Sequence, residues 1–314
     1  MVARIFTRVL LCSFATTSIA QLPKIHFTGK EKVNLISTRE TKNCFVSLVS
    51  IGNNVYLVKQ KKDSKKQLAV VRDALSSYVA RELDIAQDVL IVSYKKKFPG
   101  KIKSTWPATI HTLAPGETVR VQKNSKYNML RLRQFWAGAK NFGEKGLTRD
   151  IITYMTWHKQ LPIIVALDLL IGNSDRHCGN LCYDPKTDTF CAIDMDDTFN
   201  KDLCLLACKK IKIMLDDDSI VLTRQELKAL QIMRNTLTFL IKKHTPKDII
   251  EKMYSFATKA GFIRSSKIHN VRIVRKLWLY EKMITKSYKS ARRLIVLLDT
   301  IILRKSRTLE IMER

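Results

Sequence analysis

The sequence predicts an α+β protein of two lobes, a small β-rich lobe with one helix followed by a larger, mainly helical lobe. Short apolar segments separated by turn residues, with one helical pattern among them, occupy residues 33–113. Apolar residues at helical spacing dominate from residue 127 onward. The composition, 46% hydrophobic with few Gly or Pro, suits one large or two modest cores. We expect the lobes to span residues 21–116 and 117–314.

The first twenty residues have the layout of a cleavable export signal. Arg4 and Arg8 precede the apolar run Val9–Ala15, and small residues lead up to Ala20. We therefore expect a signal peptide over residues 1–20 and an exported protein, periplasmic or secreted. A short apolar N-terminal strand or helix is the alternative. No other segment approaches the roughly 20 apolar residues that span a bilayer, so no transmembrane span is predicted.

The net charge of +28 indicates an acidic partner. Nucleic acid, an anionic membrane and an acidic protein surface all fit, and composition does not choose among them. Of seven cysteines, Cys12 lies in the predicted signal. The remaining even number permits disulfides in an exported protein. Cys178/Cys182 and Cys204/Cys208 have spacings that suggest zinc, but cysteines in apolar stretches usually behave as small buried hydrophobic residues.

The small lobe is expected to begin with three strands, at Val33–Ser37, Cys44–Val49 and Val55–Lys59, the last after the Gly52-Asn53-Asn54 turn. Because side chains alternate along a strand, Val55, Leu57 and Lys59 share one face. Lys59 is thereby expected to project inward and is the candidate phosphate-binding lysine. With Lys61 and Lys62 beside it, a solvated strand end is the alternative.

One helix and two strands complete the predicted small lobe. The helix runs from about Lys66 to Leu83, with apolar residues at helical spacing. Strands are expected at Val89–Tyr94 and Ala108–Leu113, and the turn Ala114-Pro115-Gly116 leads to the second lobe.

The segment Leu167–Phe199 is the stretch around which the chain is organised. An apolar helix ends at Gly172-Asn173, a polar loop follows, and a turn-rich hairpin leads to a short apolar strand before Asp194. Within the loop, Asp175 and Asn180 are separated by the interval found between the Asp and Asn of a protein-kinase catalytic loop. The alternative is a polar loop in which Asp194 caps a turn.

These residue types suit phosphoryl transfer. Magnesium takes carboxylate and amide oxygens, so Asn180 and Asp194 on neighbouring segments are candidate metal ligands. The acceptor hydroxyl must be oriented and relieved of its proton by a residue nearby. Asp175 or His177 is the candidate for that task.

Further helices are expected from Thr148, at Leu203–Leu215, at Thr223–His244 with Thr223 and Glu226 in capping-box spacing, and at Pro246–Ala260. The last segment, Ile263–Arg314, is rich in bases. If a helix from Arg272 to Leu298 packs through its apolar side, its bases form an outward stripe. That stripe consists of Arg275, Lys276, Lys282, Lys286, Lys289 and Arg293. A solvated helix face is the alternative.

The string Asp175-Arg176-His177 with Asn180, and Ile193-Asp194 after a hairpin, resembles the catalytic core of the phosphatidylinositol 3/4-kinase-like branch of the kinase superfamily. That branch includes actin-fragmin-kinase-like and HipA-like atypical kinases. The resemblance implies a two-lobed protein-kinase-like fold, ATP and Mg²⁺ as cofactors, Asp175 or His177 on the acceptor side, and metal ligation by Asn180 and Asp194. The chain departs from the lipid-kinase pattern directly after Asp194, where it reads Met195-Asp196-Asp197.

The same resemblance assigns roles in the small lobe. It implies that a helix carboxylate holds Lys59, for which Asp73 and Glu82 are the choices and Asp73 has the matching position. It also implies adenine packing near Leu113. The loop that would cover the phosphates, Ser37–Asn43, contains no glycine, so backbone amides or the Ser37 and Thr38 hydroxyls would have to contact them.

The sequence therefore predicts an ATP- and magnesium-dependent kinase whose acceptor is a hydroxyl of a protein or of a phosphoinositide lipid. The expected partners are a nucleotide and an acidic protein or anionic membrane, with nucleic acid also possible. The alternative function is an exported, basic, polyanion-binding protein on a catalytically inactive kinase-like fold.

Overall fold

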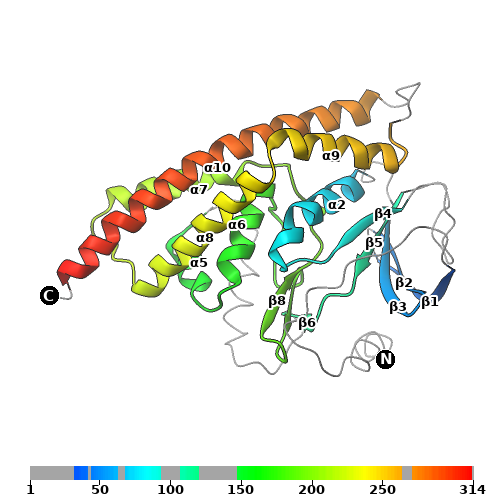
Figure 1. Ribbon diagram of the computed structural model, residues 1–314, viewed down its shortest axis with the longest axis horizontal. Coiled ribbons are helices and arrows are strands. Elements are labelled where there is room, and N and C mark those ends of the chain that lie inside the picture. Colours follow the sequence, from blue (N-terminus) through cyan, green and yellow to red (C-terminus); the bar gives the residue numbers. More distant parts are fainter. Residues whose placement is uncertain are drawn as a thin grey trace.

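The computed structural model describes residues 32–41, 44–62, 68–92, 107–119, 147–263 and 271–312. A small lobe holds an antiparallel sheet and one long helix, and a larger lobe is mainly helical (Figure 1). The fold class predicted from the sequence is confirmed. The predicted signal peptide, residues 1–20, lies outside the described residues and stays a prediction, as does the domain division at residue 116.

The small lobe is a five-stranded sheet in the order β1-β2-β3-β5-β4, with every neighbouring pair antiparallel. Helix α2 packs against β4 and β5 and continues into one 3-10 turn. The elements are β1 (Val33–Glu40), β2 (Cys44–Ile51), β3 (Asn54–Lys61), α2 (Ala69–Ala80), β4 (Val89–Val92) and β5 (Ala108–Thr112). Each predicted element of this lobe is therefore present, with shifted ends.

One prediction in this lobe was wrong in detail. Strand pairing of β1 continues to Glu40, and the Thr38 hydroxyl lies 3.1 Å from that of Ser47 on β2. Ser37 and Thr38 therefore belong to a strand, and the predicted phosphate-covering loop at Ser37–Asn43 is shorter than expected. On β3 the side chains of Tyr56 and Val58 are buried, and Lys59 lies on the opposite face, from which it extends toward Asp194 of the larger lobe.

The larger lobe contains a three-stranded sheet in the order β6-β7-β8, and its other described elements are helices. Helix α10 lies along one side of the lobe and packs on α7, α8 and α9 (Figure 1). The elements are β6 (Glu117–Thr118), α5 (Arg149–Met155), α6 (Leu161–Ile171), β7 (Leu181–Asp184), β8 (Thr189–Ala192), α7 (Leu203–Asp216), α8 (Arg224–Lys243), α9 (Pro246–Lys259) and α10 (Val271–Met312).

Helix ends follow local chemistry in this lobe. Thr223 and Glu226 form the predicted capping box of α8, and Thr245 and Asp248 form a second one at α9. Helix α10 spans 42 residues, longer than the predicted Arg272–Leu298, because its apolar spacing continues to Ile301 and beyond. Among the described residues, no helix is both long enough and apolar enough to cross a bilayer.

The two lobes share one core. Residues of α2, β4 and the following helical lobe belong to the same buried apolar cluster. The backbone N–H of Ala192 on β8 donates to Ile85 O, and Gln87 N–H donates to Ala192 O at 3.3 Å. These bonds fix β8, and with it the segment that carries Asp194, against the small lobe.

Six cysteines in the described residues are free thiols, five of them buried. Cys182 and Cys191 lie directly opposite each other on β7 and β8 without a bond between them. Disulfides that the sequence permitted are therefore not formed by these six residues.

Gly116 lies where the chain passes from one sheet to the next, and its replacement is a test of that passage. Its φ is +72°, and a Cβ there would lie 2.1 Å from the carbonyl oxygen of Tyr183 on β7. Gly52 has a similar φ of +58° but open space around it. We expect Gly52→Ala to cost about 1 kcal/mol through backbone strain alone. Gly116→Ala should cost several times more in denaturant unfolding, and equal losses would contradict the close approach.

Candidate active site

The polar loop begins where α6 ends. Gly172 adopts a φ of 65° at the end of the helix, and its backbone N–H reaches back to Leu169 O. A Cβ at this position would lie 2.2 Å from the carbonyl oxygen of Lys201, so only glycine fits. The predicted helix stop is confirmed, and it delivers residues 173–180 to the face of the lobe that meets the small lobe.

A buried ion pair holds this loop. The guanidinium of Arg176 donates to both carboxylate oxygens of Asp168 on α6, at 2.9 and 3.0 Å, and both side chains are fully enclosed. The same guanidinium donates to the backbone oxygens of Asn180 and Ile193. Asn173 adds a further bond to Asp168 at 2.8 Å. One arginine thus fixes the polar loop and the residue before Asp194 in a single arrangement.

Asn180 and Asp175 lie together on the loop. The Asn180 amide donates to the backbone oxygen of Asp175 at 2.9 Å and to its carboxylate at 3.4 Å. Because the amide nitrogen donates these bonds, the amide oxygen of Asn180 is the atom of this side chain that could serve as a metal ligand. Asp175 is exposed, and partial burial raises the pKa of its carboxyl group.

Asp194 meets Lys59 across the two lobes. The ammonium nitrogen of Lys59 on β3 lies 3.3 Å from Asp194 Oδ1. Lys59 lowers the pKa of Asp194 to about 2. Burial by itself would lower the pKa of Lys59, but the negative charges of Asp194, Asp73 and Asp196 outweigh burial, so the pKa of Lys59 is raised. Asp194 has a φ of 54°, which is uncommon for a residue other than glycine. Such local strain is typical of functional sites.

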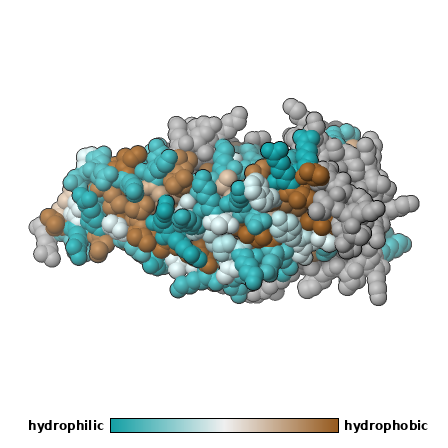
Figure 2. Space-filling model, turned by 90° about the horizontal axis from the view of Figure 1, so that it is seen from above, coloured by the Kyte–Doolittle hydropathy of each residue, from teal (hydrophilic) through white to brown (hydrophobic). Residues whose placement is uncertain are grey.

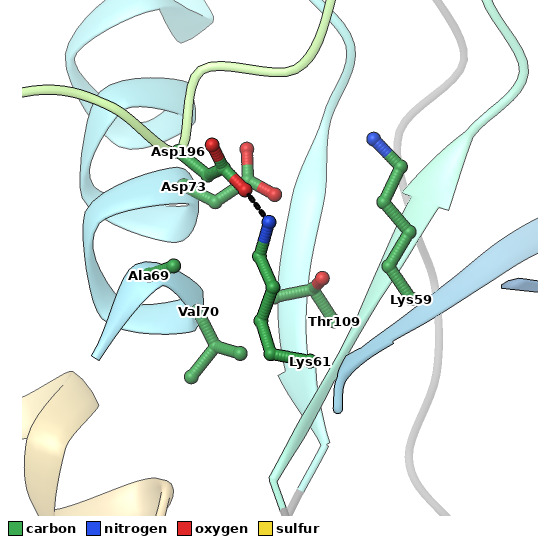
Figure 3. A pocket seen from close by; sticks show the side chains of 7 residues that line it. All are labelled: Lys59, Lys61, Ala69, Val70, Asp73, Thr109 and Asp196. Carbon is green, nitrogen blue, oxygen red and sulfur yellow. Dashed lines mark hydrogen bonds and ion pairs between the residues drawn. The ribbon is translucent and has the colours of Figure 1, made fainter. Parts of the chain in front are cut away.

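A second lysine and aspartate form a parallel contact. Lys61, two residues after Lys59 on β3, donates to Asp196 Oδ2, and both side chains are largely buried. Figure 3 shows the ammonium of Lys61 pointing toward Asp196 and Asp73, while Lys59 extends in a different direction. The small pocket between these groups is also lined by Ala69, Val70 and Thr109.

The predicted ion pair between Lys59 and Asp73 was wrong. Asp73 on α2 is buried and contacts Nε2 of His111 on β5 at 3.2 Å. Lys59 pairs with Asp194 instead, and Asp73 acts on it only as a nearby charge. Burial raises the pKa of Asp73 to about 7 and lowers that of His111 well below its usual value. His111 is therefore neutral at physiological pH.

Helix α2 instead holds the segment after Asp194. Arg72 forms an ion pair with Asp197 at 3.6 Å, and the Ser76 hydroxyl lies 2.9 Å from that of Thr198. The remaining predicted nucleotide contact, Leu113, is half-buried just after β5. The structure thus brings Lys59, Asn180, Asp175 and Asp194 to the meeting of the lobes, with Asp73 behind them.

Sequence reasoning gave no role to Arg176, Asp168, Lys61, Asp196 or His111. A signal existed for Asp168, since a charge inside an apolar helix requires a partner, and Arg176 follows within the same stretch. Asp196 was noted only as a departure from the lipid-kinase pattern. The contact of Lys61 with Asp196 joins residues 135 positions apart and has no local signal.

The buried pair of Asp168 and Arg176 provides a stability test. We expect Asp168→Ala to lower the free energy of unfolding by about 3–5 kcal/mol, because it leaves the arginine buried and unpaired. The double variant Asp168→Leu/Arg176→Met should lose less than that single variant. The exposed pair of Arg234 and Asp299, at 2.8 Å, is the control, and Asp299→Ala should cost at most about 1 kcal/mol. Equal losses in the two single variants would contradict the assigned role.

Asp73 provides a test by pH. Its pKa of about 7 in the folded protein lies above the ordinary value of 3.8, so the folded state binds more protons between these values. This carboxyl group therefore contributes less stability as pH rises from about 4 to 7. We expect Asp73→Asn to become progressively more stable relative to the parent over that window, by an order of a few kcal/mol, and to keep that difference above it. Parallel stability curves measured from pH 4 to 8 would contradict this.

Comparison with known proteins finds similar solved structures at low identity. No family model matches the chain, and no curated protein matches it. The chain is similar to the proinflammatory kinase CtkA of Helicobacter pylori, with 15% identity, 90% of this chain and 99% of that chain covered, and a TM-score of 0.47. HipA of Shewanella oneidensis, solved with HipB and operator DNA, has 12% identity, coverage of 96% and 72%, and a TM-score of 0.40. The Rio2 kinase of Chaetomium thermophilum, solved as an ADP/Mg²⁺-phosphoaspartate complex, has 10% identity, coverage of 83% and 70%, and a TM-score of 0.35.

Proposed function

We propose that the chain is an ATP- and magnesium-dependent phosphotransferase of the kinase type. The observation that carries the proposal is the contact of Lys59 with Asp194, 3.3 Å across the two lobes. It lies beside the loop that holds Asp175 and Asn180, because Ile193 N–H donates to the backbone oxygen of Asn180 at 3.1 Å. A lysine from the sheet, an aspartate after the hairpin and an Asp-Asn loop together suit phosphoryl transfer.

The donor atoms fit magnesium. Asp194 supplies a carboxylate with a pKa of about 2, so it is ionised throughout the neutral range. Asn180 supplies an amide oxygen, and the nitrogen of the same amide donates a hydrogen bond to the backbone oxygen of Asp175. These two hard oxygen ligands on adjacent segments would hold the ion, which when bound neutralises phosphate charge.

The two lysines of β3 would take the phosphates. Lys59 and Lys61 are each paired with one aspartate, so the site is balanced in charge by its own residues. Phosphate oxygens compete with Asp194 and Asp196 for these ammonium groups, and magnesium competes for the carboxylates. Nucleotide and metal are therefore expected to strengthen each other's binding. Phosphate bound to the lysines frees the carboxylates for magnesium, and magnesium bound to the carboxylates frees the lysines for phosphate.

On the acceptor side the geometry favours Asp175 as the base. His177 Nδ1 accepts from the backbone N–H of Gly179 at 3.0 Å, so a neutral ring carries its proton on Nε2 and has no free acceptor nitrogen. Asp175 is exposed and has a raised pKa, which makes it a better proton acceptor than an ordinary carboxylate. As the acceptor oxygen bonds to the γ-phosphorus and the bond to the leaving oxygen breaks, the hydroxyl proton passes to Asp175.

The acceptor class remains the one proposed from the sequence, a hydroxyl of a protein or of a phosphoinositide lipid. The resemblance to the phosphatidylinositol 3/4-kinase-like branch supports the proposal through the Asp175-Arg176-His177 string and Asn180. The competing proposal is a catalytically inactive fold that binds polyanions, supported by the net charge of +28. Nucleotide binding and transfer distinguish the two.

A thermal-shift experiment with ATP and MgCl₂, separately and together, tests the proposal. We expect the two ligands together to stabilise the parent by more than the sum of their separate effects. A nucleotide at a hundred times its dissociation constant contributes about 2.7 kcal/mol. Asp194→Asn should lose this synergy because it removes a metal ligand. Asp175→Asn should keep the shift but slow γ-phosphate release or transfer by roughly 10²–10⁴-fold.

The control is Asp150→Asn, which makes the same change on an exposed residue of α5. It should behave like the parent in both assays. Equal loss of nucleotide binding in Asp175→Asn and Asp194→Asn would show that the two roles are misassigned. A parent protein that gives no shift with ATP and MgCl₂ would favour the inactive, polyanion-binding alternative.

A further inference from the structure

The outer face of α10 mixes bases with exposed apolar side chains. Residues that lie within about a third of the helix circumference include Trp278, Val296 and Leu303, with exposed fractions of 47%, 64% and 57%. Bases alternate with them along the same face: Arg275, Lys282, Lys286, Lys289, Arg292 and Arg293, all exposed. Figure 2 shows the side of the molecule on which α10 lies, with hydrophobic residues interspersed among hydrophilic ones. We call this surface the α10 outer face.

The bases of the α10 outer face between Arg275 and Arg293 have no ion pair with any described residue. The nearby acidic residues of α10 interact with side chains of the neighbouring helices instead. Asp299 pairs with Arg234 on α8, and Glu281 accepts from the Tyr254 hydroxyl on α9. The positive charge of this face is therefore not compensated within the described part of the chain.

Exposed lysines of α7 add positive charge beside the α10 outer face. Helix α7 packs along α10, and Lys212 of α7 and Arg293 of α10 both act electrostatically on the Cys208 thiol between the two helices. Lys209 and Lys212 are exposed. Helix α10 spans 42 residues, about 63 Å at 1.5 Å per residue, so the α10 outer face is long and nearly linear.

We propose that the α10 outer face docks on an anionic lipid bilayer. Bases near such a surface are attracted to acidic headgroups, and exposed Trp, Val and Leu side chains gain by entering the headgroup boundary. Tryptophan in particular favours that boundary. A nucleic-acid backbone attracts the bases equally but offers nothing to the aliphatic side chains that alternate with them. The mixed character of the face therefore selects the bilayer over the duplex.

The electrostatic half of the proposal is tested by flotation with vesicles of phosphatidylcholine, with and without phosphatidylserine. The parent should bind only the vesicles with phosphatidylserine, and more weakly as salt rises. Lys286→Gln/Lys289→Gln should weaken binding about thirtyfold, given the contribution of each base near an anionic surface. The control, Lys159→Gln/Lys186→Gln, makes the same charge change at exposed positions before α6 and in the β7–β8 turn, away from α10 (Figure 1). Equal weakening in both double variants would overturn the proposal.

The apolar half is tested by Trp278→Ser/Val296→Ser, which leaves the charge unchanged. This variant should weaken binding to phosphatidylserine vesicles at least tenfold while leaving binding to heparin and duplex DNA unchanged. Unchanged vesicle binding would overturn the proposal, as would a parent that binds DNA but not vesicles. Thermal melts that match the parent confirm that these exposed substitutions keep the fold. Because the docking assays contain no nucleotide, their outcome is independent of the proposed catalytic function.

Discussion

The arrangement of the site depends on one buried arginine. Arg176 donates to both carboxylate oxygens of Asp168 on α6 and to the backbone oxygens of Asn180 and Ile193. A buried guanidinium without these acceptors would be severely destabilising, so the ion pair favours this one arrangement of the loop and of the end of β8. The candidate ligands Asn180 and Asp194 are therefore placed by a residue that contacts neither substrate nor metal in the proposed reaction.

The second constraint is charge balance where the lobes meet. Two lysines on one strand face two aspartates on the segment after β8, and each pair neutralises itself. Helix α2 does not supply the expected partner for Lys59. It holds the same aspartate-rich segment through Arg72 and Ser76, and buries Asp73 against His111. The ion pairs of Lys59 and Lys61 thus join the small lobe to the segment after β8.

The sequence predicted elements and loop spacing well because these depend on local patterns. Gly172 as a helix stop, the Thr223–Glu226 capping box and the hairpin before Asp194 all arise from neighbours in the chain. Predictions failed where distant residues compete for one partner. Lys59 had two candidate carboxylates on the helix, Asp73 and Glu82, and it meets neither, because it pairs with Asp194 of the other lobe. The end of β1 was also underestimated, because cross-strand pairing with Val46 and Phe45 carries Arg39 and Glu40 into the sheet despite their polarity.

Helix α10 lies between the α10 outer face and the candidate site, but it contributes no residue to that site. On its inner side, the Tyr280 ring lies 5.5 Å from the guanidinium of Arg72, the residue that pairs with Asp197. The neighbouring inward residues, Leu277 and Ile284, are fully buried in the shared core, so this side of the helix is fixed by close packing. A partner on the outer face contacts side chains that have no role in that packing. Docking there is accordingly expected to raise the local concentration of a membrane-bound acceptor. The intrinsic rate on a small soluble acceptor should stay the same, because docking leaves the contacts that position Asp194 and Asn180 unchanged.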